Sequence, residues 1–158
     1  MEYKGKRTPA GEMLTGLLLD LFRVSSLLST AGDRLVARLE LTSARWQILG
    51  AIAAAERPEP VAWLARNLGA HRQNVQRIVH DLHSQGLVQF EANPHHRRAQ
   101  LVVLTDQGKQ AFDLAMRLQA PWVNELSEGL STRDLQTVRH VLAMLRHKLE
   151  RNGGEERS

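Results

Sequence analysis

Residues 61–88 read VAWLARNLGAHRQNVQRIVHDLHSQGLV, and this stretch decides the fold. Its first part predicts a short helix that stops at Gly69, because glycine adopts the left-handed backbone of a helix end at little cost. A second helix is expected from about Arg72 to Gln85. Its apolar residues recur at the spacing of one buried helix face, namely Val75, Ile78, Val79 and Leu82. Two helices joined by a tight turn that contains glycine form a helix-turn-helix.

Two short strand-like runs follow the second helix. They read LVQFE (87–91) and AQLVVL (99–104), and the segment ANPHHRR (92–98) joins them. This pattern predicts a β-hairpin with a long tip. The hairpin would lie beside the helix-turn-helix as a wing.

Helical patterns flank this central part on both sides. Apolar residues recur at helical spacing over residues 12–39, and a helix capped by Thr42 leads into the helix-turn-helix. After the hairpin, Thr105 caps a long helix and a last helix follows. The expected fold class is mainly α with a small β-hairpin. A winged helix-turn-helix over residues 42–104 would be flanked by helices over 12–39 and 106–150, all within one domain of 158 residues.

Composition narrows the classes of function. The net charge is +4, and residues 66–98 hold five arginines against two acids, so 5 − 2 = +3 lies in that one segment. Such a local excess suits a polyanion, although a solvated basic face is the alternative. The chain has no cysteine, which fits a reducing cytoplasm. No window of about 18 apolar residues is apparent, so no membrane span is expected. No serine lies in a nucleophile elbow, and an enzyme is not expected.

The outward face of the second helix is rich in amide and guanidinium groups. At about 100° per residue, Gln73, Arg77 and His80 lie opposite the buried face. Arginine can bond two atoms of guanine, and glutamine or asparagine two atoms of adenine. An ordinary solvated face more often carries Glu–Lys pairs, whereas Asp81 is the only acid here. We therefore predict contacts to double-stranded DNA from Arg72, Gln73, Asn74, Gln76, Arg77 and His80, with Gln73, Gln76 and Arg77 reading bases.

The tip of the wing extends this expected interface. A hairpin beside the reading helix can reach an adjacent minor groove or a row of phosphates, and guanidinium groups suit both. Histidines can gain protons beside phosphates. The DNA contacts predicted for the wing are His95, His96, Arg97 and Arg98.

Taken in order, these elements resemble the MarR family of bacterial transcription regulators. The resemblance covers about residues 12–150 and rests on LTSARWQILGAI (41–52), on residues 61–88 and on NPHHRRAQLVVLTDQGK (93–109). It implies a homodimer whose N- and C-terminal helices pair, and repression of nearby genes that a small aromatic or anionic effector often relieves. One departure is His96, where the family usually has an aspartate that pairs with an arginine. The tip is therefore either held differently or ordered on DNA.

Two further sets of residues complete these expectations. The terminal helices carry more leucine-rich surface than one winged helix needs, which predicts a homodimer or, alternatively, a bundle within one chain. The residues expected near the dimer interface are Leu14, Leu17, Leu21, Val141, Leu142 and Leu145. Trp46 lies in the region where the family's ligands sit, and Arg45 beside it would pair with an anionic ligand. Trp63 is expected to pack in the core.

Two alternative functions stay open. His80 and His83 have the spacing of a metal pair on one helix turn, which would suit a metal-responsive sensor. No carboxylate or cysteine with ligand spacing accompanies them, so neither a metal nor a cofactor is expected. The other alternative is a protein-interaction module on the same fold without DNA binding. The arginine and glutamine face favours the DNA-binding interpretation.

Overall fold

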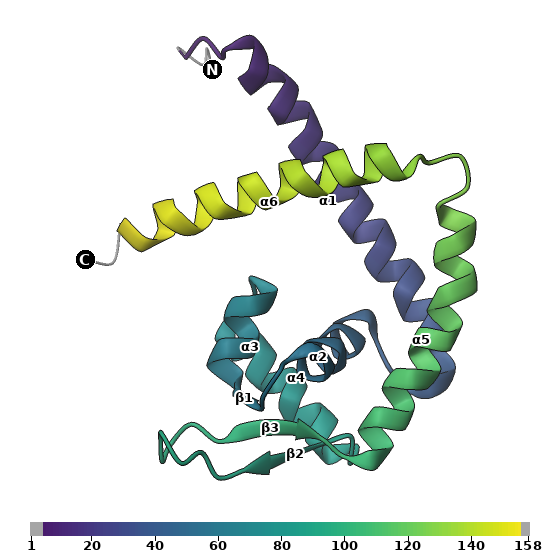
Figure 1. The fold of residues 1–158 in the computed structure, drawn as a ribbon, viewed down its shortest axis with the longest axis vertical. Helices are drawn as coiled ribbons and strands as arrows, with labels where there is room; N and C mark the ends of the chain where they lie inside the picture. The colour runs from purple at the N-terminus through teal and green to yellow at the C-terminus, as the bar shows by residue number, and fades with distance from the viewer. Residues whose placement is uncertain (1–4, 156–158) are drawn as a thin grey trace. The chain divides into compact units, whose positions relative to one another are not determined.

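The computed structural model describes residues 5–155, so both ends of the expected domain lie outside the described residues. Helices and a small antiparallel sheet build the fold, which confirms the expected winged helix class (Figure 1). The chain divides within its fifth helix into two compact units, one ending at Gln119 and the other beginning at Ala120. In chain order the elements are α1 (Pro9–Val36), η1 (Ala37–Leu39), α2 (Ser43–Ala54), β1 (Glu59–Pro60), α3 (Val61–Leu68), α4 (Arg72–Ser84), β2 (Val88–Glu91), β3 (Leu101–Leu104), α5 (Asp106–Leu126) and α6 (Thr132–Glu155).

Helix α1 is apolar enough on average to pass a test that the search for about 18 apolar residues in a row did not apply. Over residues 9–39 its most apolar window of 18 residues has a mean hydropathy of 1.3, and none of that window is buried. By length and composition alone, this helix is able to cross a membrane, so the expectation that no segment is apolar enough was wrong. One such helix is weak evidence for a membrane span, because a helix that packs against another protein surface has the same composition.

Helices α1 and α2 approach each other closely at Gly32. The Ser43 hydroxyl donates to the Ser29 carbonyl oxygen over 2.6 Å, and the Ser43 backbone N–H donates to Asp33 Oδ1 over 2.7 Å. A Cβ at position 32 would collide with the Ser43 hydroxyl. Glycine at this position therefore lets the start of α2 bond directly to α1.

The core lies between α2, α3, α4 and the sheet. Helix α4 buries the four apolar residues that the sequence assigned to one face, which confirms that prediction. Helix α3 buries Val61, Leu64 and Ala65 instead of its tryptophan. Trp63 is 46% exposed, so its expected place in the core was wrong. A helix of eight residues has room for one buried face, and the smaller side chains occupy it.

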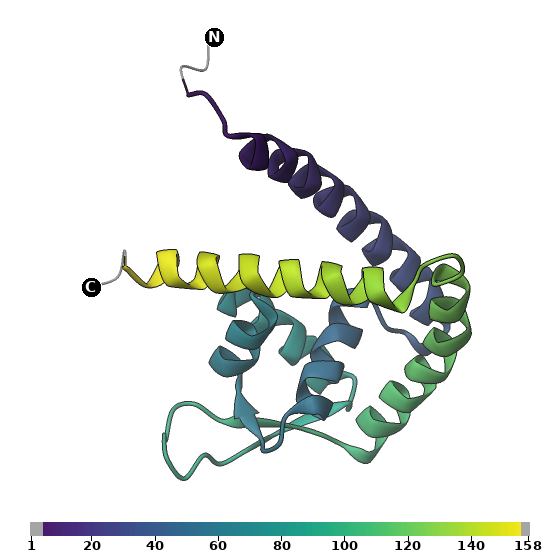
Figure 2. The ribbon, with the colours of Figure 1, turned by 45° about the horizontal axis from the view of Figure 1, so that its top comes forward.

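The sheet has three strands in the order β1-β3-β2, one more than the hairpin that the sequence predicted. Strands β2 and β3 pair antiparallel, with Val88 opposite Leu104 and Glu91 opposite Leu101. Strand β1 adds two residues to the other side of β3, with Pro60 opposite Leu101. Figures 1 and 2 both show the loop between β2 and β3 extending away from α2 to α4, as a wing does.

The start of α5 holds the base of the wing. The Thr105 hydroxyl accepts from the Gly108 N–H over 3.0 Å, which confirms the predicted cap, and it donates to the Gly86 carbonyl oxygen over 2.6 Å. The Thr105 N–H donates to the Leu87 carbonyl oxygen over 3.1 Å. A Cβ on Gly108 would collide with that same carbonyl oxygen. The first turn of α5 can therefore pack against the backbone of Leu87, just before β2, only because residue 108 has no side chain.

The terminal helices leave apolar side chains at their surfaces. On α1, Leu17 and Leu21 are 44% and 38% exposed, and Leu14 is half-buried. On α6, Leu142 is 37% exposed, and Val141 and Leu145 are half-buried. The exposed large apolar residues of both helices exceed the scattered few that a monomer normally shows.

Candidate nucleic-acid interface

Helix α4 presents its polar face to solvent because its opposite face is anchored in the core. Each of the six residues predicted to contact DNA from this helix is accessible, with Gln76 half-buried and the other five exposed. Pro60, Arg72 and Gln76 line a small groove together with Arg98 and Gln100 of the wing. The first two turns of α4 and the loop of the wing therefore line the same groove.

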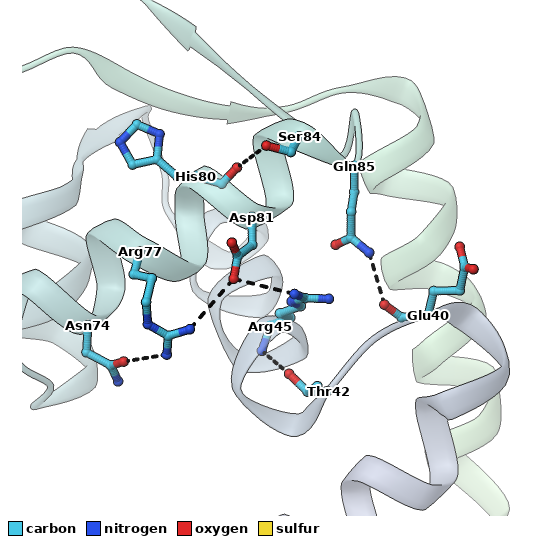
Figure 3. Close-up of polar contacts among 9 residues, drawn as sticks. All are labelled: Glu40, Thr42, Arg45, Asn74, Arg77, His80, Asp81, Ser84 and Gln85. Carbon is cyan, nitrogen blue, oxygen red and sulfur yellow. Dashed lines mark hydrogen bonds and ion pairs between the residues drawn. The ribbon is translucent and has the colours of Figure 1, made fainter.

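Asp81 connects the polar face of α4 to α2 (Figure 3). Its Oδ2 atom lies 3.4 Å from Arg45 Nη2 on α2 and 3.7 Å from Arg77 Nη1, one turn earlier on α4. Arg77 Nη2 also donates to Asn74 Oδ1 over 2.9 Å. The guanidinium of Arg77 is thus held at both ends along the helix, while its side chain is 66% exposed.

A second contact fixes the far end of α4. Gln85 Nε2 donates to the backbone carbonyl oxygen of Glu40 over 3.1 Å. Glu40 has a φ of 57°, in the left-handed region that costs energy for a residue with a side chain. The strained corner before α2 is therefore tied to the C-terminal end of α4, as Figure 3 shows.

The histidines of α4 lie against their neighbours. Gln76 Nε2 and His80 Nε2 are 3.1 Å apart, and the His80 and His83 rings lie with their centroids 5.8 Å and 5.1 Å from that of Phe90 on β2. Among the residues that the structure describes, no group of three or more His, Cys, Asp or Glu side chains is placed to hold a metal ion. The two rings pack α4 onto the wing.

Asn93 holds the tip of the wing. Its Nδ2 atom donates to the Ala99 carbonyl oxygen over 2.9 Å, and its Oδ1 atom accepts from the His95 N–H over 3.0 Å. Both sides of the tip are therefore braced by one side chain. The tip of the wing is thus held by Asn93, three residues before His96. Arg97 and Arg98 remain exposed at the tip.

The structure reveals a groove that sequence reasoning missed. It has a volume of about 600 Å³ and lies between α3 and the wing, with Trp63 and Pro60 on one side and His95 and Leu101 on the other. Arg57 Cζ lies 6.0 Å from the centre of the Trp63 ring. Arg57 precedes β1, in a segment whose sequence carries no periodic signal, and its neighbourhood depends on a strand that was not predicted.

Arg45 and Trp46, the residues predicted to bind an effector, face different surroundings. The Arg45 guanidinium points to Asp81 on α4, and the Trp46 ring is half-buried and packs against the core. The sequence could not reveal the partner of Arg45, because Asp81 lies 36 residues further along the chain.

Comparisons with known proteins agree with this geometry. Residues 39–99, which span α2 to the wing, match the sequence model of the MarR family. An uncharacterized protein of Mycobacterium tuberculosis is 35% identical over 126 residues, which cover 80% of this chain and 87% of that protein. The transcriptional activatory protein BadR of Rhodopseudomonas palustris is 27% identical over 146 residues, covering 89% of this chain and 82% of its own.

Solved structures share the fold over most of the chain. The transcriptional regulator PA3341 superposes with a TM-score of 0.74 at 27% identity, over 87% of this chain and 98% of its own. The transcriptional repressor CouR, solved with a 23-mer DNA duplex, has a TM-score of 0.73 at 24% identity, over 89% of this chain and 99% of its own. CouR from Rhodococcus jostii has also been solved with p-coumaroyl-CoA, and this structure has a TM-score of 0.72 at 21% identity, over 83% of this chain and 90% of its own.

Proposed function

The chain belongs to the MarR family and is a DNA-binding transcriptional regulator, and from this premise we propose that it is a ligand-responsive repressor that binds an inverted-repeat operator as a homodimer. The observation that carries the proposal is the polar face of α4. Its arginine, glutamine and asparagine side chains stand on a helix whose other face is locked in the core. The wing, with two exposed arginines, lies at the edge of the same surface.

Helix α4 enters the major groove, and its N-terminal half reads bases. In helix-turn-helix proteins the beginning of the second helix reaches the base edges. Gln73, Gln76 and Arg77 are the groups with the donor geometry for this task. Arg72, Asn74 and His80 flank them. The wing reaches the adjacent backbone or minor groove through His95, His96, Arg97 and Arg98, where guanidinium groups suit phosphate and a narrow groove alike.

Dimerisation uses the exposed leucine faces of the terminal helices. Residues 12–39 and 106–150 supply the dimerisation helices, with residues 42–104 as the DNA-binding lobe. The interface includes Leu14, Leu17, Leu21, Val141, Leu142 and Leu145. Burial of such faces against a second copy removes apolar area from water, at about 25 cal/mol per Å². A two-fold axis then sets two lobes on an inverted repeat with half-sites roughly 10 bp apart.

Repression relieved by a small aromatic or anionic effector is the regulatory part of the proposal. CouR supports it as a repressor that has been solved with both DNA and p-coumaroyl-CoA, whereas BadR is named as an activator. Arg45 and Trp46 are the proposed effector contacts. The Arg45 guanidinium already pairs with Asp81 on α4. An anionic effector at Arg45 would therefore compete with the Asp81 carboxylate and weaken this link between α2 and α4. The protein acts in the cytoplasm, where its DNA is.

Selection from a random DNA pool tests the proposal directly. We expect enriched sequences with two-fold symmetry, and binding whose logarithm falls steeply with the logarithm of salt concentration. A protein-interaction module would show neither. Light scattering at micromolar concentration should give the mass of a dimer, and a monomeric mass would contradict the assembly. An unsymmetrical selected site would contradict the inverted repeat while leaving DNA binding intact.

A further inference from the structure

The single acidic residue of α4 is placed where an acid should harm DNA binding. Asp81 lies on the helix that we place in the major groove, and a carboxylate there repels phosphates. Its side chain is 39% exposed, so it is not hidden from the surroundings. The same Oδ2 atom that faces Arg77 on α4 also faces Arg45 on α2 (Figure 3). The acid therefore lies between two arginines from different helices.

The contact with α2 distinguishes this arrangement from an ordinary helix-surface ion pair. A pair of exposed charges four residues apart on one helix contributes little and leaves both side chains mobile. Arg45 changes this, because its side chain is only 28% exposed and its helix is anchored by the buried residues Ile48 and Leu49. Asp81 is thus fixed from outside α4, and so is the position of its Oδ2 atom.

Because Asp81 is fixed, the guanidinium of Arg77 that pairs with it is held in place as well. Asp81 holds its Nη1 side and Asn74 holds its Nη2 side, so the guanidinium lies along the helix between them. An arginine has five N–H donors, and the remaining ones stay free to face a base edge. A side chain that is already ordered loses less conformational entropy when it binds.

We propose that Asp81, anchored by Arg45, is a positioning residue that holds Arg77 for base reading and thereby sets the sequence preference of the protein. The inference rests on the proposed function, because it assumes that α4 reads bases. Beyond the proposed function, it assigns two opposite effects on DNA binding to Asp81. Asp81 weakens binding to DNA of any sequence through its charge, and it strengthens the discrimination between the right and the wrong site through Arg77.

Two substitutions separate positioning from charge. Asp81→Asn removes a negative charge, and Arg45→Ala removes a positive one. Both release Arg77, so both should lower the ratio of random-DNA to selected-site dissociation constants by about threefold or more. Their effects on random DNA should have opposite signs: Asp81→Asn tightens binding and Arg45→Ala weakens it. The two variants change the charge in opposite directions. Charge alone therefore cannot lower the ratio of the dissociation constants in both.

The measurement uses the full-length protein and two labelled duplexes of equal length, one carrying the site selected by the wild type and one of random sequence. Dissociation constants are measured over a series of salt concentrations. Asp113→Asn is the matched control, because it removes the same charge from an exposed position on α5. Its specificity ratio should equal that of the wild type.

The double variant Asp81→Asn with Arg77→Ala shows whether Asp81 acts through Arg77. Without Arg77, the change at residue 81 should leave the specificity ratio unaltered. An equal fall in both backgrounds, or an unchanged ratio in Asp81→Asn and Arg45→Ala, would overturn the inference and leave Asp81 as a link between α2 and α4. If Asp81→Asn does not fold, Arg45→Ala decides the question by its ratio. A wild type that binds no duplex overturns the proposed function itself, which is a different result.

Discussion

The two surfaces proposed to touch DNA are built in opposite ways. On α4 the polar side chains bond to one another and to α2, so Arg77 is held by Asn74 and Asp81 before any ligand arrives. On the wing the bracing comes from Asn93, which bonds backbone groups. Within the part of the chain that the structure describes, Arg97 and Arg98 form no ion pair.

This difference matches two different tasks. Base readout needs donors at fixed positions, because a bidentate bond tolerates little error in direction. Contact with phosphates needs charge more than direction, because the field of the backbone is broad and independent of sequence. A held arginine therefore suits specificity, and a free arginine at the end of a braced loop suits affinity.

The largest effect is expected on stability, from the glycine of α5 that packs against the base of the wing. Gly108→Ala would drive a Cβ into the Leu87 carbonyl oxygen, and a backbone atom cannot move aside as a flexible side chain can. We expect a loss of about 3 kcal/mol in the free energy of unfolding, the upper range for overpacking. Denaturant titration measures it. Gln110→Ala, an exposed change two residues away in the same helix, should have almost no effect. Equal stability of both variants would mean that the wing is not seated in this way.

The next largest effect tests the reading helix. Arg77→Ala should cost about 1–3 kcal/mol on the selected operator, because a bidentate contact to guanine is lost. On random DNA the loss should be clearly smaller. Fluorescence anisotropy with both duplexes gives the two values side by side. An equal loss on both would make Arg77 a phosphate contact and would remove the difference between the two surfaces.

Arg98→Ala tests the wing and should show the reverse pattern. Affinity should fall by a similar factor for selected and random DNA. The slope of log affinity against log salt should become shallower by about 0.9 for each subunit that makes the contact. Arg117→Ala on α5, also an exposed arginine, should leave the slope unchanged. A sequence-dependent loss in Arg98→Ala would indicate that the wing reads the DNA, through groove width or base edges.

The smallest effect is expected from the brace itself. Asn93→Ala removes two hydrogen bonds of the wing tip, one to Ala99 across the loop and one to His95 beside it, each with a net contribution of about 0.5–1.5 kcal/mol to stability. Backbone amide exchange at His95 should become faster, while exchange in the middle of α4 should stay as it is. DNA affinity should fall slightly and equally on all sequences. Unchanged exchange at His95 would show that the tip is ordered by other contacts.

Local patterns in the sequence were sufficient for most of the architecture. The buried face of α4, the caps at Thr42 and Thr105 and the position of the hairpin all depend on residues within one or two turns of each other, and each was predicted and found. Strand β1 was missed because two residues, one of them proline, carry no periodicity. Trp63 was misplaced because side-chain size does not tell which face of a short helix is buried.

The contacts that shape the candidate interface were beyond the reach of the sequence for a common reason. Arg45 and Asp81 are 36 residues apart, and Gln85 and Glu40 are 45 residues apart. Such pairs exist only once α2 and α4 have packed. The sequence therefore indicated which residue types lie on the reading face, but it did not indicate that Arg77 is held in place or by which groups. The roles of these residues in binding stay predictions.

The short strand β1 has a consequence for how this protein behaves at high concentration. It forms one outer border of the sheet, with Pro60 opposite Leu101. The outer strand of a sheet is where a second chain can add its own strand and begin an aggregate. Proline has no N–H to offer to such a chain, and a strand of two residues gives little length to pair with. Pro60, which stands at the start of α3, thus also makes β1 a poor partner for the strand of a second chain.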